Sequence, residues 1–252
     1  MTDIASLIAA LDELLDPGAY ADLGPNGLQV PGAREVTRVV TGVSAQRQLS
    51  ERAVELGAQL VLVHHGLFWD FQPTGLTPVL AERLRPLFKH DINLAAYHIP
   101  LDAHAELGNN ALLAQALGCD SHEPFGSYSG RPIGRKATFQ SGITAHELRE
   151  RIRAVTHRDP LFQGGGPERL RAIGIVSGSA SDMLQQAIGE GLDAFLTGEP
   201  REHVMADAQE SGIHFIAAGH YATETFGVRA LGDLLQERFG IEHVFVDLPN
   251  PV

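Results

Sequence analysis

The sequence predicts an α/β protein made of two similar domains. Short apolar stretches alternate with longer amphipathic segments along the 252 residues, which is typical of strands joined by helices. Glycine and proline separate these segments. The segment Gly57–His65 also has a counterpart at Gly191–Glu199, and each follows a strand, a glycine turn and a helix. We therefore expect an internal duplication.

In the first half, apolar residues at helical spacing predict a helix over 4–15, which Asp16-Pro17-Gly18 ends. Pro25-Asn26-Gly27 forms a turn, and Gly57 caps the helix before it. Val61-Leu62-Val63 is typical of a buried strand. The other elements expected here are an extended piece at 28–30, strands at 36–43 and 92–97, and helices at 45–56, 76–90 and 109–117.

In the second half, Thr144 and Glu147 predict a capping box at the start of a helix that runs to about Val155. The glycine-rich stretch 163–167 lacks the Lys-Ser/Thr of a P-loop and is interpreted as a flexible connection. Further expected elements are strands at 133–140, 170–177, 194–197, 213–218 and 243–246, and helices at 182–189, 202–210 and 221–238. The expected domains are 1–125 with 222–252, and 126–221.

Composition limits the class of protein. Apolar residues make up 44% and charged residues 20%, which suits a globular protein with a sizeable core. No apolar run approaches the ~20 residues of a membrane span, and the acidic start is not a signal peptide. The single cysteine, Cys119, fits a reducing cytoplasm. A formal charge of −12 disfavours nucleic-acid binding without excluding it, and it leaves room for a small anionic substrate at a metal.

Two histidines end the central apolar stretch, at His64 and His65. Side chains alternate along a strand, so both can reach one site only where the strand ends, and Gly66 permits the turn. Strand ends are where open α/β sheets place ligands, and imidazole is the commonest metal ligand. Two interpretations are open for this pair: a metal site, or histidines held by hydrogen bonds.

The repeat continues beyond these strands. Ala95-Ala96-Tyr97-His98 matches Ala217-Ala218-Gly219-His220, and an acid follows each histidine by four residues, at Asp102 and Glu224. Two related halves packed about a pseudo-twofold axis would direct their strand ends into one cleft. We expect this cleft to collect His64, His65, His98, Asp102, His220 and Glu224.

Imidazoles and carboxylates together favour zinc, iron or manganese over calcium or magnesium. A catalytic zinc takes three protein ligands, so this many candidates suggest two divalent ions per chain, with Glu224 or Asp102 bridging. Paired ions activate water, which predicts hydrolysis or hydration of a small polar molecule.

Several residues keep a second interpretation. His98 either binds metal or orients a ligand by a hydrogen bond. Glu199 either faces the cleft or begins the next helix, and Asn26 either contacts substrate or supports a turn. Trp69 either lines the cleft or anchors the core.

Six motifs resemble the Nif-three-like dinuclear-metal family, whose members are named GTP cyclohydrolase type 2 homologues, and the ending Asp247–Pro251 resembles its short bacterial members. The resemblance covers nearly the whole chain and is weakest over 123–166. The motifs, in the order of the family, are Asn26–Val30, His64–Trp69, His98–His104, Leu107–Ala111, Thr197–Glu199 and Ala218–Glu224.

The resemblance implies two similar α/β domains with the metals between them, and a toroidal homohexamer. It implies that Glu224 bridges two ions held by His64, His65, Asp102, His220 and Glu224. Two functions follow as hypotheses. One is a metal-dependent hydrolase acting on a nucleotide-like small molecule, and the other is a non-catalytic, metal-dependent scaffold or regulatory binder.

Overall fold

The computed structural model describes residues 1–252, which divide into two compact units. Unit 1 comprises Met1–Leu101 and Gly227–Leu248, and unit 2 comprises Asp102–Phe226 and Pro249–Val252. Residues 102–125, 222–226 and 249–252, expected in the first domain, lie in unit 2. The reason is packing, because Leu113 and Ala114 of helix α5 (Asn109–Ala116) are buried in the core of unit 2.

Unit 1 contains a five-stranded sheet in the order β13-β4-β5-β6-β2. The first four of these strands pair in parallel and β2 is antiparallel to β6. β4 and β5 are almost fully buried, which explains their valine-rich sequences. The strands are β2 (Gly27–Val30), β4 (Arg38–Ser44), β5 (Leu60–His65), β6 (Asn93–Ala96) and β13 (Glu242–Phe245).

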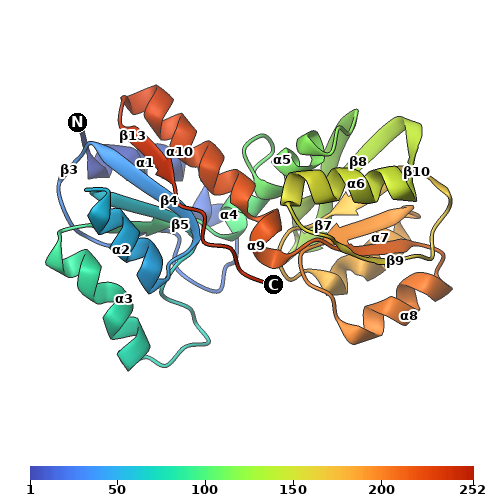
Figure 1. The fold of residues 1–252 in the computed structure, drawn as a ribbon, viewed down its shortest axis with the longest axis horizontal. Helices are drawn as coiled ribbons and strands as arrows, with labels where there is room; N and C mark the ends of the chain where they lie inside the picture. Colours follow the sequence, from blue (N-terminus) through green and yellow to red (C-terminus); the bar gives the residue numbers. More distant parts are fainter. The chain divides into compact units, whose positions relative to one another are not determined.

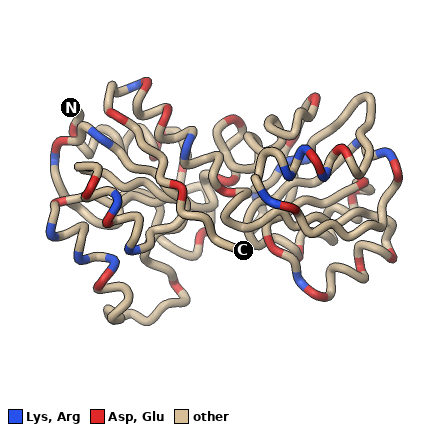
Figure 2. The backbone as a smooth tube through the Cα atoms, in the orientation of Figure 1, with Lys and Arg blue, Asp and Glu red and all other residues tan.

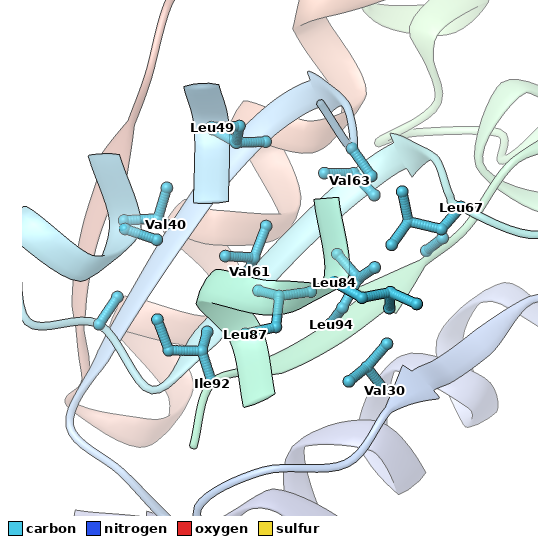
Figure 3. Close-up of a cluster of buried hydrophobic side chains, with 14 of the residues drawn as sticks. Val30, Val40, Leu49, Val61, Val63, Leu67, Leu84, Leu87, Ile92 and Leu94 are labelled. Carbon is cyan, nitrogen blue, oxygen red and sulfur yellow. The ribbon is translucent and has the colours of Figure 1, made fainter. Parts of the chain in front are cut away.

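Helices cover both faces of this sheet. α2 (Arg47–Glu55) and α3 (Pro78–Lys89) lie on one face, where Leu49, Leu84 and Leu87 meet valines of the strands (Figure 3). α10 (Thr225–Phe239) lies on the opposite side of the sheet in Figure 1. The alternation of side chains along β5 explains this division, because Val61 and Val63 belong to the first face. α1 (Ile4–Leu15) ends at Asp16, as expected.

Unit 2 contains a six-stranded sheet in the order β7-β8-β10-β11-β12-β9. The central strands β10, β11 and β12 are parallel, and β8 and β9 flank them in antiparallel orientation. The strands are β7 (Ser121–Tyr128), β8 (Arg131–Thr144), β9 (Leu161–Gln163), β10 (Arg169–Ile175), β11 (Ala194–Thr197) and β12 (His214–Ala217).

The helices of unit 2 also divide between two faces, as Figure 1 shows. On one face, α5 and α6 (Ala145–Thr156) bury Leu113, Leu148 and Ile152 against the strands. α7 (Leu184–Gly189) and α8 (Glu202–Glu210) lie on the other. The capping box of Thr144 and Glu147 is confirmed, with both of its hydrogen bonds formed at the start of α6.

The two sheets share one topology. In each, a parallel β-α-β-α-β series follows a short strand that pairs antiparallel with the third strand of the series. The series is β4-α2-β5-α3-β6 after β2 in unit 1, and β10-α7-β11-α8-β12 after β9 in unit 2. The α/β class and the similarity of the two halves are thus visible in the connectivity.

Several elements differ from the sequence expectation. β7 was not expected, because Pro124 and Gly126 disfavour a strand, but β7 lies at a sheet edge where proline is tolerated. It forms a hairpin with β8 through Ser129 and Gly130, whose positive φ angles suit a tight hairpin turn. β8 is therefore longer than the expected strand at 133–140. Strand β9 was also not expected, and it ends where the predicted loop begins, at Gln163.

The helix expected over 221–238 is divided in two. α9 (His220–Thr223) and α10 are separated at Glu224, which is not helical. A further short helix, α4 (Ile99–Ala103), forms despite Pro100, which occupies a first-turn position where proline is tolerated. The remaining short elements are β1 (Thr2–Asp3), β3 (Glu35–Val36), η1 (Pro17–Ala19) and η2 (Ser181–Met183).

Charged residues of both signs are interspersed along the chain (Figure 2). Basic residues on the helices of unit 1 form ion pairs with nearby acids, such as Arg47 with Glu51 and Arg85 with Glu82. No helix is both long and apolar enough to span a membrane. Burial raises the pKa of Cys119 to about 12, so this residue remains a neutral thiol near pH 7.

Candidate metal centre

Three imidazoles gather at the strand ends of unit 1. His64 and His65 end β5, and His98 follows β6 by two residues. The ring centroids of His64 and His65 are 4.7 Å apart, and His98 lies 5.0 Å from His64 and 5.5 Å from His65. Each offers a ligand atom, and the three atoms lie within 4.8 Å of one another. His64 and His65 therefore reach one site where the strand ends, as the alternation of side chains along a strand requires.

Each of these rings is held through Nδ1. Nδ1 of His64 bonds the carbonyl oxygen of Tyr97 at 2.9 Å, and Nδ1 of His98 bonds a carboxylate oxygen of Asp22 at 2.7 Å. Because both partners only accept hydrogen bonds, the neutral rings carry the proton on Nδ1 and the lone pair on Nε2. Nδ1 of His65 lies 3.0 Å from the hydroxyl of Ser44. The contacts of His64 and His98 fix the tautomer that a metal ligand needs, and that of His65 orients its ring.

A loop of unit 1 positions His98. Asn26 donates to the Asp22 carboxylate at 2.9 Å and accepts from the backbone N–H of His98 at 2.7 Å. The N–H of Ile99 also donates to Asp22, at 3.0 Å. Burial raises the pKa of Asp22, but hydrogen bonds from His98, Asn26 and Ile99 outweigh it and lower the pKa overall. Asn26 thus supports the turn, and Asp22 is a contributor that sequence reasoning missed.

Trp69 packs beside these histidines. Its ring meets His98 edge-on at 5.1 Å between centroids and stacks on Phe71 at 5.8 Å. The indole N–H donates to the carbonyl of Gly66 at 3.1 Å. Trp69 therefore contacts the imidazole cluster directly.

Unit 2 gathers a second cluster, of acids and one imidazole. His220 begins α9, and its Nε2 lies 3.1 Å from a carboxylate oxygen of Glu224. Its Nδ1 bonds the carboxylate of Glu199, so Glu199 contacts this cluster. Ligand oxygens of Asp102 and Glu224 lie within 4.8 Å of each other. Asp102 and Glu224 are both buried.

Polar partners from two segments, α5 and the turn after β10, hold Asp102. Its carboxylate accepts from the side-chain amide of Asn109 at 2.8 Å and from the hydroxyl of Ser177 at 3.0 Å. Asn110 bonds the carbonyl of Asp102 at 3.2 Å and accepts from the N–H of Ser177 at 2.7 Å. Both asparagines are fully buried. They hold the acid in place, a role that cap and turn statistics do not predict.

Gly178 leaves the space in which Glu224 lies. Its φ is +66°, and a Cβ at this position would approach a carboxylate oxygen of Glu224 to 2.3 Å and Nε2 of His220 to 3.3 Å. Its N–H donates to the hydroxyl of Thr223 at 3.2 Å. The glycine turn after β10 is therefore required by the donor cluster as well as by the backbone.

The whole chain matches one family model. The Duf34/NIF3 (NGG1p interacting factor 3) model covers residues 2–251. The chain belongs to the DUF34/NIF3 family.

Relatives of this DUF34/NIF3 chain are similar over their full length. A protein of Pseudomonas aeruginosa is 42% identical over 248 residues, 98% of each chain, and one of Escherichia coli K12 is 40% identical over 251 residues, 99% of this chain and 98% of its own. Both are named GTP cyclohydrolase 1 type 2 homolog.

Solved structures of similar proteins share the fold of this chain. Protein ybgI, described as of unknown function, has a TM-score of 0.93 at 39% identity, and TTHA1606 from Thermus thermophilus has 0.92 at 36%, each over 100% of both chains. HcgD from Methanocaldococcus jannaschii shares the fold with a TM-score of 0.85 at 22% identity, over 98% of both chains.

The donor set of this DUF34/NIF3 chain fits a transition metal. Imidazole nitrogens in unit 1, and carboxylates with an imidazole in unit 2, suit zinc, iron or manganese better than calcium or magnesium. Burial lowers the pKa of His220, but Glu224 and Glu199 outweigh it and raise the pKa to about 9. Without a metal this ring is therefore charged at pH 7, and a metal must displace its proton.

Proposed function

We propose that this chain is a dinuclear metal-dependent hydrolase acting on a small polar, nucleotide-like substrate. The proposed ligands are His64, His65, Asp102, His220 and Glu224, and Glu224 bridges two divalent ions of zinc, iron or manganese. The observation that carries the proposal is that polar partners already hold the proposed ligands in place. These side chains are buried or half-buried, and such partners are present in both units. The name of the 42% identical relative, GTP cyclohydrolase 1 type 2 homolog, supports the substrate class.

Chain connectivity supports placing both clusters on one pair of ions. Asp102 is the first residue of unit 2 after the chain leaves unit 1, and Glu224 precedes its return at Gly227 by three residues. Two acidic donors therefore flank the crossings between the units. Helices α4 and α10 include these crossings, which fixes the local backbone near each acid.

Two ions held by these donors would supply Lewis acidity toward both the attacking water and the leaving group. The residues themselves position and transfer protons. Glu199 and Glu224 contact opposite nitrogens of His220 and stabilise its charged form when no metal is bound. Asn109 and Ser177 donate to Asp102, which keeps its oxygens oriented. As the proposed bridge, Glu224 is also our candidate to accept a proton from the attacking water.

Turnover of a nucleotide panel tests the proposal. Protein loaded with zinc, iron or manganese is expected to convert at least one member, including GTP, and chelated protein is expected to convert none. Glu224→Gln keeps the shape of the side chain and removes its charge, so it is expected to lower turnover by about 10²-fold. His203→Asn, at an exposed histidine, serves as the control. Turnover unchanged in Glu224→Gln, or absent across the panel, contradicts a hydrolase.

A non-catalytic scaffold is the second candidate. The family description names an interacting factor, and this chain exposes large apolar side chains that a partner can cover. A protein partner captured only by metal-loaded protein, together with saturated metal coordination, would favour this function over hydrolysis. The single cysteine of this chain fits a protein that functions in the reducing cytoplasm.

We further propose self-association into a homohexamer. Phe71, Leu76 and Val79 are 71%, 69% and 63% exposed and lie along one stretch of unit 1, which we call the apolar loop patch. Exposed apolar groups of this size favour an interface. Leu76→Asp with Val79→Asp is expected to reduce the mass measured by light scattering from six chains to fewer. Leu161→Asp, in unit 2, is the control. An unchanged mass in the double variant would show that the patch is not an interface.

A further inference from the structure

We propose that Arg158 binds an oxyanion of the substrate, such as a phosphate group, beside the acids and the imidazole of unit 2. We call these four residues the unit 2 cluster, and they are Asp102, Glu199, His220 and Glu224. The inference rests on the proposed function and deepens it, because it gives the substrate a negatively charged group and names the residue that recognises this group. Arg158 belongs to none of the six motifs found in the sequence.

The register of the unit 2 sheet brings Arg158 level with His220. Strand β9 pairs antiparallel with β12, and Leu161 lies opposite Ala217. Continuing this register by three residues beyond both strands places Arg158 opposite His220, where the chain leaves β12 and enters α9. Open α/β sheets bind ligands at the carboxyl ends of their parallel strands. Arg158 therefore lies at the edge of the sheet where a substrate is expected.

The guanidinium group of Arg158 packs on the backbone next to His220. A Cβ added at Gly219 would lie 2.9 Å from Cζ of Arg158 and closer still to a guanidinium nitrogen. The φ of Gly219 is +97°, and the missing side chain leaves this space to the arginine. Gly178 and Gly198, which follow β10 and β11, would place an added Cβ 3.3 Å and 2.7 Å from atoms of His220. Three glycines thus keep the space around this histidine open.

The charge of Arg158 has no partner within the chain. Its guanidinium group is half-buried and forms neither an ion pair nor a hydrogen bond. Two arginines of α6 differ in this respect. Arg151 donates to the carbonyl of Leu117 at 2.8 Å, and Arg153 lies 3.5 Å from the carboxylate of Asp159. The planar fork of arginine matches the oxygens of phosphate and carboxylate groups, so the unused donors suit an oxyanion from outside the chain.

A ligand from solvent can reach this edge of the sheet. The side chains of His220 and Glu199 are 26% and 32% exposed. The carboxylates of the cluster repel an anion, so a negatively charged substrate needs positive groups beside them. Arg201, just before α8, pairs with Asp182 at 2.7 Å, whereas Arg158 remains available.

The backbone around Arg158 is held in a defined turn. α6 ends at His157, whose φ of +56° redirects the chain. The hydroxyl of Thr156 donates to the carbonyl of Arg158 at 3.4 Å, and Pro160 is buried. An arginine that only filled the space above Gly219 would need its methylene stem and not its charge. This difference between packing and recognition can be measured.

Binding of GMP and guanosine to full-length, zinc-loaded protein tests the inference, because these two probes differ only in the phosphate group. Arg158→Met keeps an apolar stem and removes the charge. In isothermal titration calorimetry it is expected to weaken GMP binding by about 10- to 100-fold and to leave guanosine binding unchanged. Arg158→Lys keeps the charge without the fork and is expected to weaken GMP binding by about 3- to 10-fold. Arg153→Met, at a neighbouring exposed arginine, is the matched control and is expected to change neither affinity.

Three results would overturn the inference. They are equal GMP affinity in Arg158→Met and the unaltered chain, an equal loss of GMP and guanosine binding, and no binding of GMP by the unaltered chain. If Arg158→Met does not fold, Arg158→Lys decides, and unchanged GMP affinity in that variant is the contradicting result. Turnover of the nucleotide panel with a KM that is the same in Arg158→Met contradicts the inference and leaves the proposed function standing. GMP binding that depends on Arg158, without turnover of any nucleotide, supports the oxyanion site and contradicts the hydrolase.

Discussion

Removal of the divalent ions with a chelator is expected to lower Tm by about 5–10 °C. Ions that bind only the native state at about 100 times their Kd stabilise it by about 2.7 kcal/mol. For a chain of this size, 1 kcal/mol corresponds to about 2–4 °C. Metal loss also leaves the Asp102 and Glu224 carboxylates within 4.8 Å of each other. Their repulsion adds to the loss of binding energy.

The difference in Tm between loaded and chelated protein should widen from pH 6 to pH 9. In the chelated protein the pKa of His220 is raised from 6.5 to about 9. The stability that the charged ring contributes is fully present below pH 6.5 and is lost as pH rises through 9. The loaded protein does not depend on this proton, because a ligand nitrogen carries none.

Differential scanning calorimetry of both forms across this pH range measures the effect. A zinc-free buffer with magnesium in place of the chelator controls for general ionic effects, because magnesium prefers oxygen ligands. Equal melting temperatures with and without chelator would falsify the claim that the native state binds metal. A difference that narrows with rising pH would contradict the role assigned to His220.

Gly178→Ala is expected to weaken metal binding by about 100-fold or more. The new methyl group would lie 2.3 Å from a carboxylate oxygen of Glu224. The Glu224 side chain must therefore move away from its present position beside His220. Loss of the contacts that orient a metal ligand costs up to about 100-fold in metal affinity, and displacing the ligand itself costs at least as much. The positive φ of +66° adds a backbone cost of about 1–2 kcal/mol.

Gly191→Ala separates these two effects. Gly191 has the same φ of +66°, but no heavy atom lies within 4 Å of its added Cβ. In chemical denaturation of chelated protein, Gly191→Ala is therefore expected to show the backbone cost alone, and Gly178→Ala is expected to show this cost together with that of moving Glu224. Only Gly178→Ala is expected to lose affinity in a Co²⁺ or Zn²⁺ titration. Equal affinities in the two variants would show that Glu224 does not need the space beside Gly178.

The positions of the imidazoles were predictable because periodicity and strand ends constrain them. The valine-rich stretch ending at His65 forms the buried strand that its composition predicts, and the matching ending at His220 follows from the repeat. The i,i+4 relation of His220 and Glu224 was predicted and is realised at 3.1 Å. Local patterns therefore located the candidate ligands but not the groups that hold them.

The groups that hold these side chains in place are distant in the sequence, and a single sequence does not show which distant residues meet. Asp22 bonds His98 from 76 positions away, and Ser177 bonds Asp102 from 75. The hairpin of β7 and β8 was hidden because tertiary pairing overrides the low strand propensity of Pro124 and Gly126. The boundary between the two units after Leu101 could not be predicted from the sequence either, because it depends on which sheet α5 packs against.

Strand β5 both packs into the sheet of unit 1 and positions two imidazoles, so a change in its position affects both. Its inner residues, Val61 and Val63, are packed into the centre of a sheet, and its last two residues present imidazoles. A shift of this strand along its neighbours would carry both rings away from Tyr97 and Ser44 at once. Natural variation that alters the surroundings of the imidazoles should therefore accumulate in the segments around the rings, and the position of the strand in the sheet should stay constant.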